Sequence, residues 1–181
     1  MFIDEIQEIQ SFELAIRSLL SSETCDIYCA GSNAKMLSGE LATHLAGRYV
    51  EISVHSLSFR EFVQFHNLES SFENLLKYLK FGGMPFLSSI GLNQSTCYEY
   101  LKSLYSTILL KDVVSRENIR NISFLENLVF YLADNVGNLF SASNISKFLK
   151  SQRIEISPQL TINYLKALSN AFFIHKVHRT D

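Results

Sequence analysis

The sequence predicts a parallel α/β segment followed by an all-α remainder. Near the N-terminus, short apolar runs alternate with segments whose apolar residues recur at helical spacing, an order typical of parallel strands joined by crossover helices. From about residue 58, apolar residues recur mainly at helical spacing, until a last alternating stretch near the C-terminus. The predicted domains are an α/β core over residues 1–57, a helical lid over 58–118 and a further, mainly helical domain over 119–181.

The composition is that of a folded globular protein. Hydrophobic residues make up 47% and charged residues 19% of the 181 residues, which argues against disorder. The formal net charge is −2, so any DNA contact would depend on a local basic patch. Three cysteines are unlike a disulfide framework, and we expect reduced, mostly buried thiols in a cytoplasmic protein. No apolar run reaches the roughly 18 residues of a membrane helix, so we expect no membrane partner.

The α/β segment is predicted from five alternating elements. Residues 1–4 are predicted as a strand, and apolar residues at helical spacing predict a helix over 12–20. A second strand is predicted over 26–30, a helix over 37–45 and a third strand over 48–54. Parallel strands connected in this way bring their carboxyl ends to the same edge of the sheet.

Two adjacent acids follow the first predicted strand. An apolar run that ends in Asp4 and Glu5 is consistent with the tip of a buried parallel strand that carries carboxylates into a crevice. The same residues are also consistent with a strand that ends in a solvated acidic turn. These residues alone favour the solvated turn, and only the motifs farther along the chain favour the crevice.

The middle of the chain carries clear helix signals. Ser58 and Glu61 are spaced as a capping box, which predicts the start of a helix that joins the α/β core to the lid. A helix is predicted over 71–80, and a long helix over 96–116. Asp112 lies in the last turns of that long helix, where an acid opposes the helix dipole, so we expect it to pair with a cation such as Arg116.

The last part of the chain has the pattern of a winged helix-turn-helix. Helices are predicted from Leu125 to about Gly137, over 141–150 and over 157–168, and the alternation over 172–177 predicts a strand. Helix, turn, helix and strand in this order are typical of that fold. The hairpin of the wing would be half present in this chain.

Six short motifs occur in an order that resembles one family. The prokaryotic AAA-superfamily ATPases with a winged-helix segment and a C-terminal domain of unknown function carry such a series. In this chain the motifs are residues 2–7 (FIDEIQ), 30–35 (AGSNAK), 45–49 (LAGRY), 57–62 (LSFREF), 82–85 (GGMP) and 110–113 (LKDV). Each motif alone is loose, but the ordered series is specific and covers nearly the whole chain.

The resemblance implies a role for each polar residue near the strand ends. Asp4 would be the Walker B acid that helps to hold Mg²⁺, and Glu5 would orient or deprotonate the attacking water. Ser32 and Asn33 would occupy the sensor-1 position beside the γ-phosphate of ATP, although Asn33 is equally consistent with a simple helix cap. Arg48 would reach phosphate as an arginine finger, or it is an ordinary surface arginine.

The chain also departs from this family. The phosphate-binding loop of P-loop ATPases has the form G-x-x-x-x-G-K-[ST], and the sequence contains no such stretch. We therefore interpret the chain as an internal fragment of an ATPase that binds Mg²⁺ and ATP only in a longer parent, and we expect it to be inactive alone. In this family a strand leads into the phosphate-binding loop, and this strand would be missing as well. Its absence would leave strand edges exposed, which predicts a homodimer or a rearrangement around residues 48–54.

A DNA-binding module is the alternative function. The third helix of a winged helix-turn-helix reads the major groove in DNA-binding versions of the fold. The side chains predicted to be exposed on that helix are Gln159, Thr161, Asn163 and Lys166. The basic residues Lys147, Lys150 and Arg153 are expected nearby. Solvated helix faces have the same composition, so a protein-interaction scaffold without any ligand is a further alternative.

Overall fold

The computed structural model describes residues 1–22, 25–32, 45, 47–154 and 156–177. The chain packs as two compact units, one formed by residues 1–49 with 108–181 and the other by residues 50–107. The predicted domain limits at residues 57 and 118 stay predictions. Within the described residues, no helix is long and apolar enough to cross a membrane.

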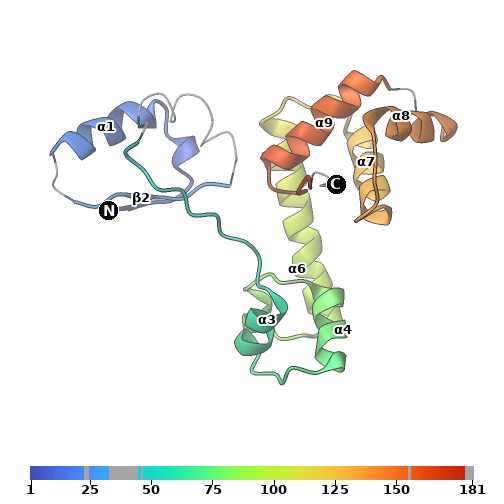
Figure 1. Cartoon of the computed structure of the whole chain (residues 1–181), viewed down its shortest axis with the longest axis horizontal. Helices are drawn as coiled ribbons and strands as arrows, with labels where there is room; N and C mark the ends of the chain where they lie inside the picture. Colours follow the sequence, from blue (N-terminus) through green and yellow to red (C-terminus); the bar gives the residue numbers. More distant parts are fainter. Residues whose placement is uncertain (23–24, 33–44, 46, 155, 178–181) are drawn as a thin grey trace. The chain divides into compact units, whose positions relative to one another are not determined.

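A short parallel sheet begins the first unit. Strand β1 (Phe2–Ile3) pairs with β2 (Tyr28–Cys29), with Phe2 opposite Tyr28 and Ile3 opposite Cys29. The connection contains a single 3-10 turn, η1 (Ile6–Glu8), and helix α1 (Phe12–Ser22) (Figure 1). Both strands form where they were predicted, although each is only two residues long. The helix predicted over 37–45 lies outside the described residues except for Leu45.

Helix α1 is joined to the sheet by a small apolar core. Its buried members are Ile6, Phe12, Ile16 and Leu45, and Ile3, Leu20 and Ile27 pack against them. Most of these residues come from the strand tip, from one face of α1 and from the segment before β2, and Leu45 comes from farther along the chain. Because burial of apolar surface is the main force that stabilises a fold, this core determines where the end of β1 lies.

The third strand predicted over residues 48–54 is not formed. Residues 49–58 have no regular secondary structure. The side chains of Val50, Ile52 and Val54 are 87%, 77% and 91% exposed. The alternation of apolar residues is real, but a strand also needs a neighbour for its backbone hydrogen bonds, and none of the described residues supplies one. The dimerisation predicted for this region stays a prediction.

The second unit contains four helices among its described residues. They are α3 (Phe59–Phe65), α4 (Phe72–Phe81), α5 (Leu87–Ile90) and α6 (Gln94–Thr107). The capping box predicted at the start of α3 is confirmed: Ser58 Oγ accepts from the Glu61 amide, and the Glu61 carboxylate accepts from the Ser58 amide at 2.8 Å. Ser71 caps α4 through its hydroxyl oxygen, which accepts from the Asn74 amide at 3.3 Å.

Two close backbone contacts fix the entry into this unit. The amide of Leu57 donates to the carbonyl of Gly83 at 2.7 Å, and the hydroxyl of Tyr78 donates to the carbonyl of Leu57 at 2.9 Å. A Cβ on residue 83 would collide with the Leu57 carbonyl oxygen, which explains the glycine at this position. The residue is therefore required for close approach of two backbone segments.

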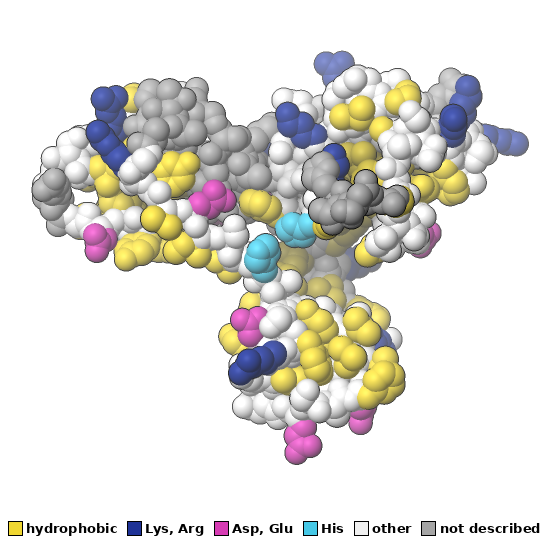
Figure 2. Space-filling view, in the orientation of Figure 1, with side chains coloured by type: hydrophobic (Ala, Val, Ile, Leu, Met, Phe, Trp, Pro, Cys, Tyr) yellow, Lys and Arg dark blue, Asp and Glu magenta, His cyan; other side chains and the backbone are white. Residues whose placement is uncertain are grey.

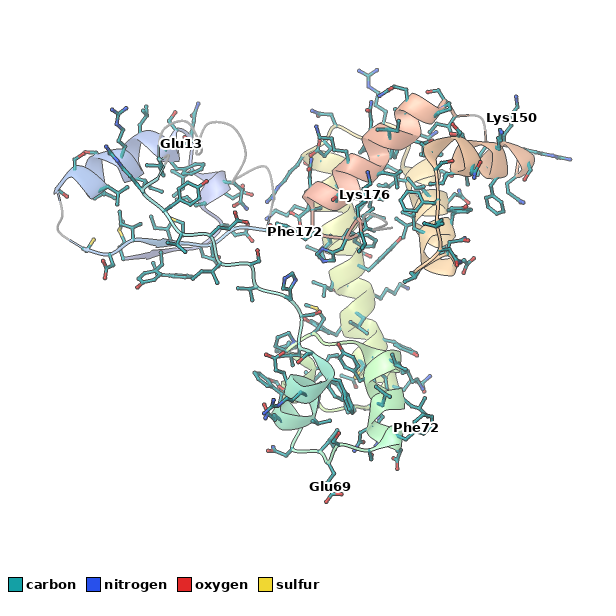
Figure 3. All side chains as sticks on the ribbon, viewed as in Figure 1. Glu13, Glu69, Phe72, Lys150, Phe172 and Lys176 are labelled. Carbon is teal, nitrogen blue, oxygen red and sulfur yellow. The ribbon has the colours of Figure 1, made fainter. Side chains whose placement is uncertain are left out.

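One face of α4 is apolar and exposed. Phe72, Leu76 and Leu79 are spaced by four and three residues, so they lie on the same side of the helix. Hydrophobic side chains gather on the face of this unit shown in Figure 2, and Phe72 is labelled on α4 in Figure 3. The opposite side of the helix contributes Asn74 and Phe81 to the buried interior.

The long helix predicted over residues 96–116 changes type along its length. Helix α6 ends at Thr107, and η3 (Ile108–Ser115) continues it as a π-helix. Leu109 and Val113 on η3 are buried. π-Helical turns are rare and often occur at functional sites, and helical periodicity alone does not distinguish them from α-helix.

Three helices complete the first unit. They are α7 (Ile122–Asp134), α8 (Ala142–Ser151) and α9 (Pro158–Asn170), capped by Asn121, Ser141 and Ser157. Their buried side chains include Phe124, Leu125, Leu128, Ile145, Leu149, Tyr164 and Leu168. Ser146 on α8 and Thr161 on α9 form a buried hydroxyl–hydroxyl hydrogen bond of 2.9 Å. The three helices were predicted with nearly these limits.

The strand predicted over residues 172–177 is also wrong. Residues 171–174 form a turn and a bend, and residues 175–177 have no regular structure. Phe172 has a left-handed backbone (φ 52°), and the amide of Phe173 donates back to the carbonyl of Leu168. This turn closes the end of α9, which competes with an extended backbone. The winged form of the fold therefore stays a prediction.

The cysteine prediction holds only in part. All three thiols are free, but Cys25 and Cys29 are exposed, whereas we expected mostly buried thiols. Cys29 lies on a strand of a sheet too small to cover it. Cys97 is buried as predicted, and burial raises the pKa of its thiol.

The capping box of α3 predicts a pH dependence. The Glu61 carboxylate accepts hydrogen bonds from the backbone amide and the side chain of Ser58, and these bonds lower the pKa of Glu61 below its usual 4.5. The stabilisation of the fold by ionised Glu61 is therefore complete at pH values above the usual pKa. It is lost as the pH falls through the lower pKa of Glu61 in the folded state. Glu61→Gln should remove this component from an acid titration followed by far-UV circular dichroism. Glu99→Gln, on α6, is the control and should titrate like the wild type.

Candidate functional site

The chain turns sharply directly after β1. Glu5 has a left-handed backbone (φ 47°, ψ 46°), which is uncommon for a residue other than glycine and is concentrated at functional sites. The Asp4 carboxylate accepts the Glu5 amide at 3.0 Å, and the Asp4 side chain is exposed. The amide of Ile6 donates to the carbonyl of Ala30 at 3.1 Å, which joins this turn to the end of β2.

The turn brings the ends of both strands together. Ser32, which follows β2, donates its hydroxyl to Glu5 Oε2 at 3.3 Å. Gln7 Nε2 donates to the same carboxylate oxygen. The proximity of Glu5 and Ser32 was predicted from the parallel arrangement of their strands. The crevice interpretation of the acidic pair stays a prediction.

A third segment reaches the same place through Arg116. Its Nη2 lies 2.9 Å from Glu8 Oε1 and 3.8 Å from Glu5 Oε2. Its Nη1 lies 3.3 Å from Asp112 Oδ1 and 3.4 Å from Ser32 Oγ. One guanidinium therefore touches side chains from both strand ends and from η3. The predicted pairing of Asp112 with Arg116 is confirmed.

The members of this cluster differ in burial. The side chains of Asp112 and Arg116 are 12% and 18% exposed, whereas those of Glu5 and Glu8 are 43% and 56% exposed. Water screens the outer pairs, so each of them contributes little to stability by itself. Three carboxylates against one guanidinium leave an excess of negative charge beside the strand tip.

The structure does not join every predicted residue to this cluster. Arg48 is exposed, and no hydrogen bond or ion pair connects its side chain to a described residue. Asn33 lies outside the described residues. Lys147, Lys150, Gln159, Asn163 and Lys166 are all exposed on α8 and α9. The expected exposure of Thr161 is wrong, because its side chain is buried and its hydroxyl bonds to Ser146.

Sequence reasoning missed two members of the cluster. The sequence pattern assigns no role to Glu8, and Arg116 was predicted only as a partner of Asp112. Their spacing of 108 residues gives no local signal. Only the four-residue spacing of Asp112 and Arg116 on one helix face could have drawn attention to the arginine.

Comparison with known proteins identifies two parts of the chain. Residues 1–63 match the family model of an AAA domain, and residues 72–181 match the model described as "Domain of unknown function (DUF8612)". The second match alone covers more than half of the chain. The chain belongs to the DUF8612 family. The first match supports an AAA-type nucleotide-binding fold for the N-terminal part of this family member.

Similar sequences occur in bacteria and archaea. An uncharacterized protein of Haemophilus influenzae is 38% identical over 99% of this chain and 45% of its own length. The uncharacterized protein MJ1544 of Methanocaldococcus jannaschii is 36% identical over 96% of this chain and 42% of its own length. The DUF8612 chain thus spans less than half the length of these relatives. No solved structure matches it.

The AAA match implies Mg²⁺ and a nucleotide, and the strand tip fits the metal-facing side of such a site. Mg²⁺ prefers oxygen ligands and usually takes one or two carboxylates together with substrate phosphates. Asp4 supplies an exposed carboxylate, and Ser32 supplies a hydroxyl. Gln7 Oε1 is buried without a partner among the described residues, and no group of three metal-ligating side chains is found among them. The loop that grips phosphate is not in this sequence.

The buried side chain of Ile6 anchors the turn that carries Glu5, so its removal should destabilise the first unit. The Ile6 side chain is 1% exposed in the core under α1, whereas Ile9 is 48% exposed. Ile6→Ala should lower the free energy of unfolding of the first unit by about 2–5 kcal/mol, the usual cost of such a cavity. Ile9→Ala is the matched control and should cost less than about 1 kcal/mol. Equal effects in urea titrations would contradict the placement of Ile6.

Proposed function

We propose that this chain is part of an AAA-type ATPase and supplies the metal-facing and water-facing side of its nucleotide site. The observation that carries the proposal is the contact of Glu5 with Ser32 at the carboxyl ends of two parallel strands. In open α/β sheets, ligands bind at this edge. The match of residues 1–63 to an AAA domain supports the same assignment.

Each residue has a definite task in this proposal. Asp4, exposed at the end of β1, helps to hold Mg²⁺ through its carboxylate. Glu5 takes a proton from the attacking water or orients it, and Ser32 lies beside the γ-phosphate. The sequence assigns the same task to Asn33, which lies outside the described residues. Arg48 contributes a positive charge to phosphate. The bound Mg²⁺-ATP supplies the phosphoryl group and the metal charge that offsets charge developing in the transition state.

Turnover requires more than these residues. Phosphoryl transfer is catalysed almost entirely by positioning and electrostatic stabilisation, and the phosphates are positioned by a glycine-rich loop with its lysine. Because the sequence contains no such loop, the proposed activity belongs to a longer protein. The chain alone is expected to give no ATP turnover above that of buffer.

The decisive variant is Glu5→Gln in that longer protein. The amide keeps the size of the side chain but cannot accept a proton, so we expect loss of at least 100-fold in kcat, the usual contribution of a general base, with nucleotide binding retained. Glu13→Gln is the control, because it makes the same chemical change in the first turn of α1 and not at the end of β1 (Figure 3). Retained turnover in Glu5→Gln, or turnover by the chain alone, would contradict the proposal.

DNA binding by α8 and α9 is the second candidate function. The observation that favours it is that Lys147, Lys150, Gln159, Asn163 and Lys166 are all exposed, while the two helices are held together by the buried Ser146–Thr161 contact. Lys150 lies on α8 with its side chain directed outwards (Figure 3). Side chains of these types contact phosphates and base edges.

This second candidate is tested with duplex DNA and the whole chain. Binding measured by fluorescence anisotropy should weaken as salt is raised, because phosphate contacts release counterions. Replacing both Lys147 and Lys150 by alanine should weaken binding further and reduce the dependence on salt. Lys102→Ala, on α6, is the control. No binding even at low salt would exclude this function.

A further inference from the structure

Residues 112–121 contact two different parts of the first unit. On one side, Asp112 and Arg116 belong to the cluster at the strand tip. On the other side, Glu117 Oε1 accepts from Asn170 Nδ2 at 3.2 Å, at the end of α9. The amide of Asn121 donates to the hydroxyl of Tyr164, in the middle of α9, at 3.3 Å. This linking segment therefore touches both the strand tip and α9.

The contact of Arg116 with Ser32 has a direction. A guanidinium can only donate hydrogen bonds, so the Ser32 oxygen must accept from Arg116 Nη1. The hydroxyl hydrogen of Ser32 is then left to donate to Glu5 Oε2. Arg116 thus fixes Ser32 as a donor to Glu5. Lysine could replace the charge of Arg116 but not the planar fork that serves Ser32 and Glu8 together.

Glu5 is the carboxylate of the cluster that lies farthest from Arg116. Arg116 lies within hydrogen-bonding distance of Glu8 but 3.8 Å from Glu5 Oε2. Glu5 Oε2 already receives hydrogen bonds from Ser32 and Gln7. When Glu5 turns away from the cluster, the hydrogen bonds from Ser32 and Gln7 break, but the contacts of Arg116 with Glu8 and Asp112 remain.

We propose that Arg116 is a positioning residue that holds Glu5 in a resting orientation through Ser32 and couples this orientation to α9. A displacement of α9 moves the linking segment, withdraws Arg116 from Ser32 and releases Glu5. By linkage, a ligand that turns Glu5 away alters the packing of α9 to the same extent. The regulatory meaning of this coupling rests on the proposed function of Glu5, but the coupling itself does not.

Amide hydrogen exchange of the whole chain without nucleotide tests the coupling. Arg116→Gln should speed exchange at Ile6 and Ala30, whose amides join the two strand ends, by roughly three- to tenfold, the range expected for a partly exposed charge network. Arg120→Gln is the matched control, because Arg120 is exposed in the same segment. It should leave these amides unchanged.

Two more variants distinguish coupling from an ordinary ion pair. Ser32→Ala removes no charge, yet it should speed exchange at Ala171 and Phe173, at the end of α9. Arg116→Lys should fail to restore the slow exchange of the wild type at the Ile6 amide. If Ser32→Ala leaves α9 unchanged, or Arg116→Lys behaves as wild type, the proposal is overturned. Ser32→Ala also provides the test should Arg116→Gln fail to fold.

These measurements separate the coupling from the ATPase proposal. Exchange is measured without nucleotide, so coupled exchange together with an ATPase-inactive longer protein would reject the proposed function alone. If Ser32→Ala leaves exchange at the end of α9 unchanged while the longer protein has activity that depends on Glu5, only the role of Arg116 is rejected.

Discussion

One guanidinium shared among three carboxylates is the interaction on which the organisation of the candidate site depends. Arg116 contacts Glu8, Asp112 and Ser32, which come from three separate stretches of the chain. The apolar core below Ile6 places the strand tip, and the caps of α7 to α9 place the helices. Among the described residues, the contacts of Arg116 join the strand tip to the segment that follows η3.

Features with a local cause could be predicted from the sequence. Ser58 and Glu61 form their capping box, and Ser71, Ser141 and Ser157 cap the helices that follow them, because a side-chain oxygen close to a free backbone amide needs no distant partner. The two strand predictions that failed, over 48–54 and 172–177, depended on distant partners. Alternating side chains show that a strand is possible, but the neighbour that takes its hydrogen bonds is decided by tertiary structure.

The same distinction applies to the site. The meeting of Glu5 with Ser32 follows from the topology of parallel strands, so it could be predicted once the strands were recognised. Arg116 could not be placed in this way, because it approaches the strand tip from a position 84 residues after Ser32. The π-helical form of η3, which precedes Arg116, has no recognisable signal in the apolar spacing. Residues whose position depends on such a segment are the ones that sequence patterns miss.

The partial burial of the Arg116 cluster has a further consequence. Glu5 and Glu8 are about half exposed, so dissolved ions can reach their side of the cluster. Mobile ions screen charges over about 8 Å at physiological ionic strength and over shorter distances in concentrated electrolyte. The attraction between Arg116 and the strand tip therefore weakens as electrolyte is added, whereas the apolar packing under α1 does not. The ionic composition of the surrounding medium thus acts directly on the joint between the strand tip and the linking segment.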